Sequence, residues 1–242
     1  MKYFLSIAAS DNCGGAGIQK DLRVADELGY RGLSAITGIT VQDDIKVDSI
    51  FPIPASVLLK QIKKNFSSYT ISTVKIGVIS SDENIIAIAD YFKKTKFPNI
   101  VLDTVFAPSR GSKFVSKASV SLFKEKLLPL VKIITPNRHE LALLSGIEIN
   151  TIEEGIIAAK QISQQYGCCV YLKGGHFNDE VLKEILVQKD RTYIIEKQRI
   201  KYKNPHGTGC TFSSALSCFL GDKMEMKKAC SKATLFVDGM YK

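Results

Sequence analysis

The sequence lacks long hydrophobic runs, paired cysteines and zinc-ligand spacing. Its apolar stretches are short, such as IIAIA at 85–89, and charged residues or glycine interrupt them, so no transmembrane helix is expected. The six cysteines form no CxxC pair and have no spacing to histidine that suits zinc. These absences favour a cytoplasmic protein with reduced thiols and no membrane association.

The basic residues are numerous but not clustered. The net charge is +9, yet most of the 33 basic residues are lysines scattered along the chain, without a basic run that contains interleaved aromatic residues. Nucleic-acid binding is therefore not expected. A lysine-rich surface instead favours an anionic small molecule as the partner.

The common nucleotide-binding motifs are also missing. The glycine-rich segment 10–21, SDNCGGAGIQKD, matches neither GxGxxG nor GxxxxGK[ST], so neither dinucleotide nor P-loop chemistry is indicated. Its glycines still allow a ligand to approach the backbone. The segment follows YFLSIAA at 3–9, which we interpret as a first buried strand rather than a secretory signal.

Short apolar runs alternate with helical patterns along the chain. This alternation predicts βαβ units, a mainly parallel sheet covered on both faces and one α/β domain spanning residues 1–242. The expected strands are 3–9, 32–40, 72–79, 99–105, 132–136 and 168–174, followed by a hairpin of 184–188 and 192–197. The expected helices are 15–29, 54–67, 82–95, about 116–129, 138–145, 151–166 and one that begins after NPHGTGC at 204–210.

Polar side chains follow several of the predicted strands, where parallel sheets bind ligands. Asp103 and Glu140 could hold Mg²⁺ directly or through water, and Lys173 beside two glycines could contact a phosphate chain. Asn137 could bind a ligand or cap a helix. Gln42, in TVQDD, suits the edge of a nitrogen heterocycle, but on this segment alone a solvent-facing turn is the favoured interpretation.

The segment NPHGTGC places two glycines and a cysteine at a helix start. The first N–H groups of a helix lack intrahelical partners and attract anions, and a helix start also lowers the pKa of a thiol. Together with Asp103, Glu140 and Lys173, this segment predicts phosphoryl transfer. Cys210 is then the candidate base, with an expected lowered pKa. The alternative is a plain glycine turn before a core helix, with Cys210 as a small apolar residue.

Seven ordered segments extend over nearly the whole chain: GGAGIQKDL, ITGITVQ, KIGV, VLDTV, LLPLVKIITPNRHE, LKGGH and HGTGC. In this order they resemble the hydroxymethylpyrimidine/phosphomethylpyrimidine kinases of thiamine biosynthesis, a family of the ribokinase-like fold. The resemblance implies a three-layer α/β/α sandwich with a mainly parallel central sheet, and ATP and Mg²⁺ as cofactors. It also implies a homodimer. The segment FAPSRGSKF at 106–114 departs from the usual family pattern.

The resemblance assigns a role to each motif. On the pyrimidine side, Gln42 resembles the residue that reads the aminopyrimidine edge, and the other expected contacts are Asp21, Gly15, Ala16 and Val78. On the phosphate side, the expected metal residues are Asp103 and Glu140, the nucleotide contacts are Asn137, Lys173 and Thr208, the anion hole is Gly207 and Gly209, and the base is Cys210.

The implied activity is two successive phosphorylations. ATP would phosphorylate the hydroxymethyl group of 4-amino-5-hydroxymethyl-2-methylpyrimidine, and then the resulting monophosphate to the pyrophosphate. One alternative is a pyridoxal or pyridoxine kinase of the same fold, which the HGTGC motif permits. The other alternative is a catalytically silent pyrimidine-sensing module, although the presence of Lys173 and Cys210 weighs against it.

Overall fold

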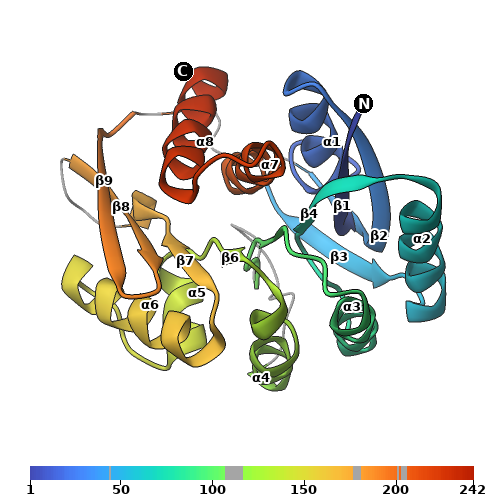
Figure 1. Ribbon diagram of the computed structural model, residues 1–242, viewed down its shortest axis with the longest axis horizontal. Helices are drawn as coiled ribbons and strands as arrows, with labels where there is room; N and C mark the ends of the chain where they lie inside the picture. The colour runs from blue at the N-terminus through green and yellow to red at the C-terminus, as the bar shows by residue number, and fades with distance from the viewer. Residues whose placement is uncertain (44, 107–116, 177–180, 201, 203–205) are drawn as a thin grey trace.

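The computed structural model describes the chain except for residues 44, 107–116, 177–180, 201 and 203–205 (Figure 1). The described residues form a nine-stranded sheet in the order β3-β2-β1-β4-β5-β6-β7-β8-β9. The strands are β1 (Lys2–Ser10), β2 (Tyr30–Gln42), β3 (Val47–Pro52), β4 (Ile71–Ile76), β5 (Ile100–Leu102), β6 (Ile133–Ile134), β7 (Cys169–Leu172), β8 (Val181–Gln188) and β9 (Arg191–Gln198).

The centre of the sheet is parallel and its edges are antiparallel. Strands β2, β1, β4, β5, β6 and β7 pair in parallel, whereas β3 pairs antiparallel with β2, and β8 and β9 continue antiparallel from β7. Strands β5, β6 and β7 are made largely of apolar residues, as expected where helices cover both faces of a sheet. All six parallel strands end at the same edge, which is where a ligand site is expected.

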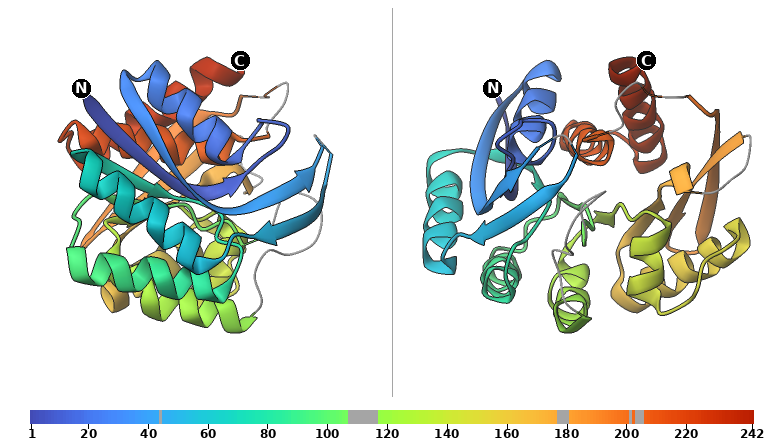
Figure 2. Two further views of the ribbon diagram at one scale, coloured as in Figure 1. Left: turned by 90° about the vertical axis from the view of Figure 1, so that its right-hand side faces the viewer. Right: turned by 180° about the vertical axis from the view of Figure 1, so that it is seen from behind.

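Helices form a layer on each face of the sheet (Figures 1 and 2). One layer contains α1 (Gly17–Glu27), α7 (Thr208–Gly221) and α8 (Met226–Tyr241). The other layer contains α2 (Ala55–Ser68), α3 (Asp82–Thr95), α4 (Lys117–Lys126), α5 (Arg138–Ser145) and α6 (Ile152–Tyr166). The predicted three-layer sandwich with a mainly parallel sheet is confirmed.

Local sequence signals account for several boundaries. Asn137 and Thr151 each begin a helix with a capping box, in which the side chain three residues later bonds back to the cap backbone. Gly146 and Gly167 end the same two helices in the left-handed conformation. The helices predicted at 82–95 and 138–145 have the observed bounds. The predicted hairpin turns at Lys189, which adopts a positive φ of 54°.

Some elements differ from the sequence prediction. β3 and α8 have no predicted counterpart: β3 is a largely exposed edge strand without a clear alternating pattern, and the apolar stripe of α8 is interrupted by lysines. The strand predicted at 168–174 ends at Leu172, because Gly174–His176 forms a 3₁₀ turn. Most of FAPSRGSKF, and Asn204 and Pro205 of NPHGTGC, lie outside the described residues.

None of the helices in the described part of the chain combines the length and apolarity that crossing a bilayer requires.

Candidate active site

The carboxyl ends of the central strands meet the first turn of α7. Asp103 follows β5, Asn137 follows β6 and Lys173 follows β7. α7 lies between α1 and α8 over the middle of the sheet (Figure 1), and its contacts with β4 and β5 bring its N-terminus to these strand ends. The fold thus gathers residues that the sequence places in separate loops.

Asp103 is the fully buried centre of this group. Its Oδ1 accepts hydrogen bonds from Lys173 Nζ at 3.2 Å and from Thr135 Oγ1 at 3.0 Å. Its Oδ2 accepts a hydrogen bond from Ser213 Oγ of α7 at 3.1 Å. Burial opposes the charge of Asp103, but the lysines at positions 173 and 75 outweigh it and hold the pKa of this carboxyl below its usual value. Asp103 is therefore an anion fixed between the sheet and α7.

Glu140 serves both a helix cap and the candidate site. Its Oε2 accepts hydrogen bonds from the Asn137 backbone N–H at 2.7 Å and from Thr104 Oγ1 at 3.1 Å. The Asn137 side chain accepts the reciprocal bond from the Glu140 N–H at 2.9 Å, so the helix-capping alternative for Asn137 is observed. Burial raises the pKa of Glu140, even though nearby Lys173 favours its charged form.

Lys173 links the two carboxylates. Its Nζ lies 3.2 Å from Asp103 Oδ1 and 3.8 Å from Glu140 Oε2. Burial works against the ammonium charge, but the attraction of Asp103 and Glu140 raises the pKa of Lys173 above its usual value. About a fifth of the side chain remains exposed. A permanent cation on a partly exposed side chain suits a phosphate group.

The glycines of HGTGC bring the backbone close to this cation. Gly207 caps α7 with a positive φ of 82°, and a Cβ there would clash with the Gly15 carbonyl oxygen. Thr208 is the first helical residue. A Cβ on Gly209 would lie 3.6 Å from Lys173 Nζ and 3.8 Å from Asp103 Oδ2, so the first turn of α7 abuts the ion pair. The N–H groups at the start of a helix can donate to an anion.

Cys210 occupies the predicted place, but its predicted pKa shift is wrong. Burial raises the pKa of the Cys210 thiol to about 11, and Asp21 and Asp103 also raise it. Lys75 and a hydrogen bond from the Gly17 backbone lower the pKa without outweighing burial. The helix start alone does not make this cysteine acidic, because the thiol is desolvated and faces two carboxylates.

Several residues predicted to bind the pyrimidine lie in loops that contact one another. The Gln42 backbone exchanges hydrogen bonds with the Asn12 side chain, and the Gln42 side chain bonds to the Asp11 carboxylate. Asp11 also accepts hydrogen bonds from the backbone of Ala16 at 2.7 Å and of Cys13 at 2.8 Å. Asp11 thereby holds the glycine loop next to the end of β2.

Gly15 and Val78 flank this region. A Cβ on Gly15 would clash with the His206 ring, so the glycine loop packs closely against the segment before α7. Val78, which follows β4, is half-buried, and its carbonyl oxygen accepts a hydrogen bond from Thr37 Oγ1 at 2.7 Å.

Asp21, which is predicted to contact the pyrimidine, is fully buried in this structure. Its side chain is fully buried, and it accepts hydrogen bonds from Ser6 at 2.6 Å, from Ser214 at 2.9 Å and from Lys75, whose Nζ lies 2.9 Å from each carboxylate oxygen. The reason is its position on the buried face of α1, where it points between the sheet and α7. Asp21 therefore lies between the sheet and α7, in contact with Lys75 and the two serines.

No sequence motif predicts a role for Lys75, Ser213, Ser214 or Asp11. Lys75 stands inside the quoted KIGV motif, in a strand pattern where a fully buried lysine is unusual. The two serines stand just after HGTGC, on the helix face that meets Asp21 and Asp103. A lysine in a buried strand and adjacent serines in an apolar helix are the signals that could have pointed to this polar interior.

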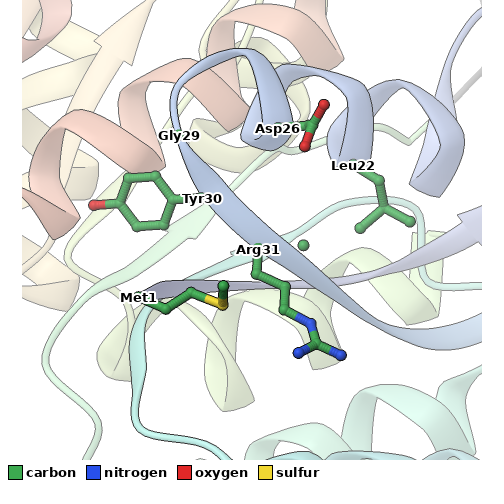
Figure 3. Close-up of a pocket in the computed structure, with 7 residues that line it drawn as sticks. Met1, Leu22, Asp26, Gly29, Tyr30 and Arg31 are labelled. Atoms are coloured by element: carbon green, nitrogen blue, oxygen red, sulfur yellow. The ribbon is translucent and has the colours of Figure 1, made fainter.

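A separate pocket lies at the opposite end of the sheet. It is lined by residues at the amino ends of β1 and β2 and at the end of α1, including Met1, Leu22, Asp26, Tyr30 and Arg31 (Figure 3). The site residues follow the carboxyl ends of the strands, so this pocket is not part of the candidate active site.

Comparisons with known proteins agree on one family. The family model described as phosphomethylpyrimidine kinase matches residues 11–242. The hydroxymethylpyrimidine/phosphomethylpyrimidine kinase of Haemophilus influenzae is 35% identical over 241 residues, which cover 98% of this chain and 90% of the relative.

Solved structures show the same likeness. The phosphomethylpyrimidine kinase from Clostridium difficile 630 has a TM-score of 0.88 and 31% identity, with 99% of each chain covered. The ADP complex of Bacillus subtilis pyridoxal kinase has a TM-score of 0.89 and 30% identity, with 98% of this chain and 90% of that chain covered. With this fold, these motifs and these relatives, the chain belongs to the phosphomethylpyrimidine kinase family of ribokinase-like enzymes.

Proposed function

We propose that the protein transfers phosphate from ATP to 4-amino-5-hydroxymethyl-2-methylpyrimidine, and then a second phosphate to the monophosphate, for thiamine biosynthesis. The observation that carries this proposal is the meeting of Lys173, Asp103 and Gly209 at the start of α7 in a member of this family. Phosphoryl transfer depends on positioned cations and backbone donors around the transferring group. We further propose that residues 1–242 act as one catalytic domain.

The nucleotide phosphates belong at the start of α7. The ADP complex of the related Bacillus subtilis pyridoxal kinase supports the use of an adenine nucleotide. In this proposal Lys173 neutralises the phosphate charge, and Asn137 and Thr208 contact the nucleotide. The N–H groups of Gly207 and Gly209 donate hydrogen bonds to the negative charge that develops on the transferring phosphate.

Asp103 and Glu140 suit Mg²⁺ when the phosphates are bound. Mg²⁺ in kinases is held by one or two carboxylates together with waters and substrate phosphates, rather than by a complete protein cage. Two carboxylates that share Lys173 provide such a partial set of ligands. Within the described residues no group of three His, Cys, Asp or Glu side chains that could hold a metal ion is found. The ion would neutralise charge on the transferring phosphate.

Cys210 is the proposed base. The raised pKa means that the thiolate is the minor form at neutral pH, and Lys75 is the nearby cation that most favours it. The thiolate takes the hydroxymethyl proton, the hydroxyl oxygen bonds to the γ-phosphorus, and the bond to ADP breaks with its electron pair remaining on ADP. Turnover therefore rises with pH as the thiolate fraction increases.

The pyrimidine belongs between the glycine loop and the ends of β2 and β4. Gln42 would read the aminopyrimidine edge, with Gly15, Ala16 and Val78 around the ring. The side-chain bond from Gln42 to Asp11 supports this placement, because it fixes which way the amide presents its donor and acceptor.

A pyridoxal kinase is the second candidate function. It is favoured by a specific observation: solved structures of pyridoxal kinases superpose on this chain as well as a phosphomethylpyrimidine kinase does. The curated relatives in sequence favour the pyrimidine.

A coupled ATPase assay with hydroxymethylpyrimidine, its monophosphate and pyridoxal, at matched concentrations, tests the proposed function. We expect turnover with both pyrimidines. Turnover with pyridoxal alone favours the second candidate, and no turnover with any of the three supports the silent sensing module instead.

We also propose that the protein is a cytoplasmic homodimer. The free thiols of Cys168, Cys169, Cys210, Cys218 and Cys230 support a reducing compartment. Apolar side chains on the ribbon of β2 and β3 support a partner: Ile39, Val41 and Phe51 are roughly half exposed or more, and Ile39 pairs with Phe51 across the strands. Light scattering of the wild type and of an Ile39→Lys variant tests this, since the variant is expected to be monomeric.

A further inference from the structure

A buried lysine–aspartate pair lies beneath the first turn of α7. Lys75 Nζ of β4 is 2.9 Å from each carboxylate oxygen of Asp21 on α1, and both side chains are fully buried. Removing two such charges from water costs several kcal/mol per ion, and apolar residues of similar size often replace a buried pair without loss of stability. Packing of the fold therefore does not explain the pair.

The pair is connected to α7 through a serine. Ser214 Oγ donates to Asp21 Oδ1 at 2.9 Å, and Ser6 Oγ donates to Asp21 Oδ2 at 2.6 Å. With the two contacts of Lys75, the Asp21 carboxylate accepts four hydrogen bonds and has little freedom to move. We call Lys75, Asp21, Ser6 and Ser214 the inner cluster.

The inner cluster resembles the Asp103 group of the candidate site, because each contains an aspartate that is bonded to a lysine and to a serine of α7. In that site Asp103 is held by a lysine that follows a strand, Lys173, and by a serine of α7, Ser213. The neighbouring serine, Ser214, joins the inner cluster in the same way. Two lysine–aspartate–serine groups thus fix the first turns of α7 on the sheet, and only one of them reaches the nucleotide side.

Cys210 lies next to the inner cluster. Ser214 follows Cys210 by one helical turn, so the two side chains share a face of α7. A Cβ on Gly77 would lie 2.8 Å from Lys75 Nζ, which places the ammonium against the backbone of the KIGV turn. In the described part of the chain, the hydrogen bonds of this ammonium go to the two Asp21 oxygens, so two of its three N–H groups are used.

The charges around the Cys210 thiol come from four elements. They are Lys75 on β4, Asp21 on α1, Asp103 after β5 and Lys173 after β7. Among them Lys75 has the largest effect in favour of the thiolate. The cation is held in place by Asp21, which is itself tied to the helix that carries Cys210.

We propose that Lys75 and Asp21 are positioning residues for Cys210: Lys75 sets the electrostatic potential at the sulfur, and Asp21, through Ser214, fixes the helix turn that carries it. The proposal rests on the proposed function for its catalytic consequence. The effect of Lys75 and Asp21 on the Cys210 thiol is independent of any substrate, so this inference and the proposed function can be tested separately.

The direct test is the rate at which iodoacetamide alkylates Cys210, followed by peptide mass spectrometry as a function of pH. In Lys75→Met we expect alkylation at pH 8 to slow about tenfold and its pH profile to move to higher pH, because the stabilising cation is gone. In Asp21→Asn the profile should move to lower pH, because a repelling anion is gone. A purely structural role would displace both profiles in the same direction, and that result overturns the proposal.

Folding and access to the thiol need their own controls. If Lys75→Met fails to fold, the double variant Lys75→Met with Asp21→Asn removes the unpaired charge. Its alkylation profile should still lie at higher pH than that of the wild type, because Lys75 affects the pKa of Cys210 more than Asp21 does. Thr73→Val with Ser217→Ala is the matched control. It removes a buried pair of hydroxyl groups, 2.8 Å apart, that joins β4 to α7, and it removes no charge. Its alkylation profile should match the wild type, and a shift as large as that of Lys75→Met contradicts the proposal.

The kinase assay separates this inference from the proposed function. We expect Lys75→Met to lower kcat at neutral pH about tenfold, with the KM for ATP changed less than twofold. If Lys75→Met shifts the alkylation profile but the wild type phosphorylates none of the pyrimidines, the proposed function is removed and the inference about Cys210 is kept. Unchanged alkylation in Lys75→Met, with an active wild type, removes the inference and keeps the function.

Discussion

Gly15 and Gly207 meet backbone to backbone: a Cβ on Gly207 would clash with the carbonyl oxygen of Gly15. The contact joins the glycine loop after β1 to the cap of α7, which is the loop proposed for the pyrimidine and the helix start proposed for the phosphates. The positive φ of Gly207 adds a second requirement for glycine at this position.

Gly207→Ala should therefore disrupt the junction between the two loops. We expect a loss of about 1–3 kcal/mol in the free energy of unfolding from the strained φ and the clash, and a larger loss of turnover from the displaced anion hole. Urea unfolding and kcat check the two effects. Gly146→Ala is the matched control, since Gly146 also caps a helix with positive φ but has no atom near its Cβ position. Equal kcat losses in both variants would remove the special role of the junction.

Cys210→Ala should lower kcat a hundredfold or more, in line with removal of a general base, while ATP affinity changes little. Steady-state kinetics and nucleotide titration measure the two quantities. Cys218→Ala is the control, because this buried thiol lies on the same helix two turns farther from the site. Near wild-type turnover in Cys210→Ala would overturn the assignment of the base.

Gln42→Ala should weaken pyrimidine binding by about 1–3 kcal/mol, the cost of leaving a buried polar partner unsatisfied. The same change also frees the Asp11 carboxylate from its side-chain hydrogen bond. The KM for hydroxymethylpyrimidine is the measurement, with the KM for ATP as the internal reference. An unchanged KM for the pyrimidine would remove Gln42 from the binding site.

The stability of the protein should fall at alkaline pH. Burial raises the pKa of Cys168 to about 12 and that of Cys210 to about 11, whereas the unfolded thiols ionise near their ordinary value of about 8.5. Above that value the folded state binds more protons than the unfolded state, so the free energy of unfolding decreases as pH rises toward the folded pKa values. Denaturant titrations at pH 7, 9 and 10 measure the slope. Cys168→Ala should have a shallower slope, and an equal slope would show that this thiol is not the cause.

The sequence predicts the layers and the catalytic edge better than it predicts the interior of the site. Asp103 and Lys173 could be placed because each follows an apolar strand, and parallel strands end together. The role of Asp21 could not be read in the same way. From the sequence, the Asp21 side chain could face either the ligand loop or the interior. Only the packing of α1 against α7 shows that this side chain points inward to Lys75.

Cys210 shows why local rules fail at a buried site. The start of a helix favours a thiolate, and this part of the prediction is physically sound. The structure adds desolvation and two carboxylates from distant segments, Asp21 and Asp103, and these raise the pKa instead. The balance depends on contacts between residues far apart in the chain, which a pattern of neighbouring residues does not contain.

The most direct test of the central claim follows the phosphorus signals while the protein converts hydroxymethylpyrimidine with excess ATP and Mg²⁺. Two successive transfers predict that a monophosphate signal appears first and is then replaced by the pair of signals of a pyrophosphate ester, with two ADP formed per pyrimidine. A reaction that stops at the monophosphate, or that proceeds only when pyridoxal replaces the pyrimidine, would contradict the account.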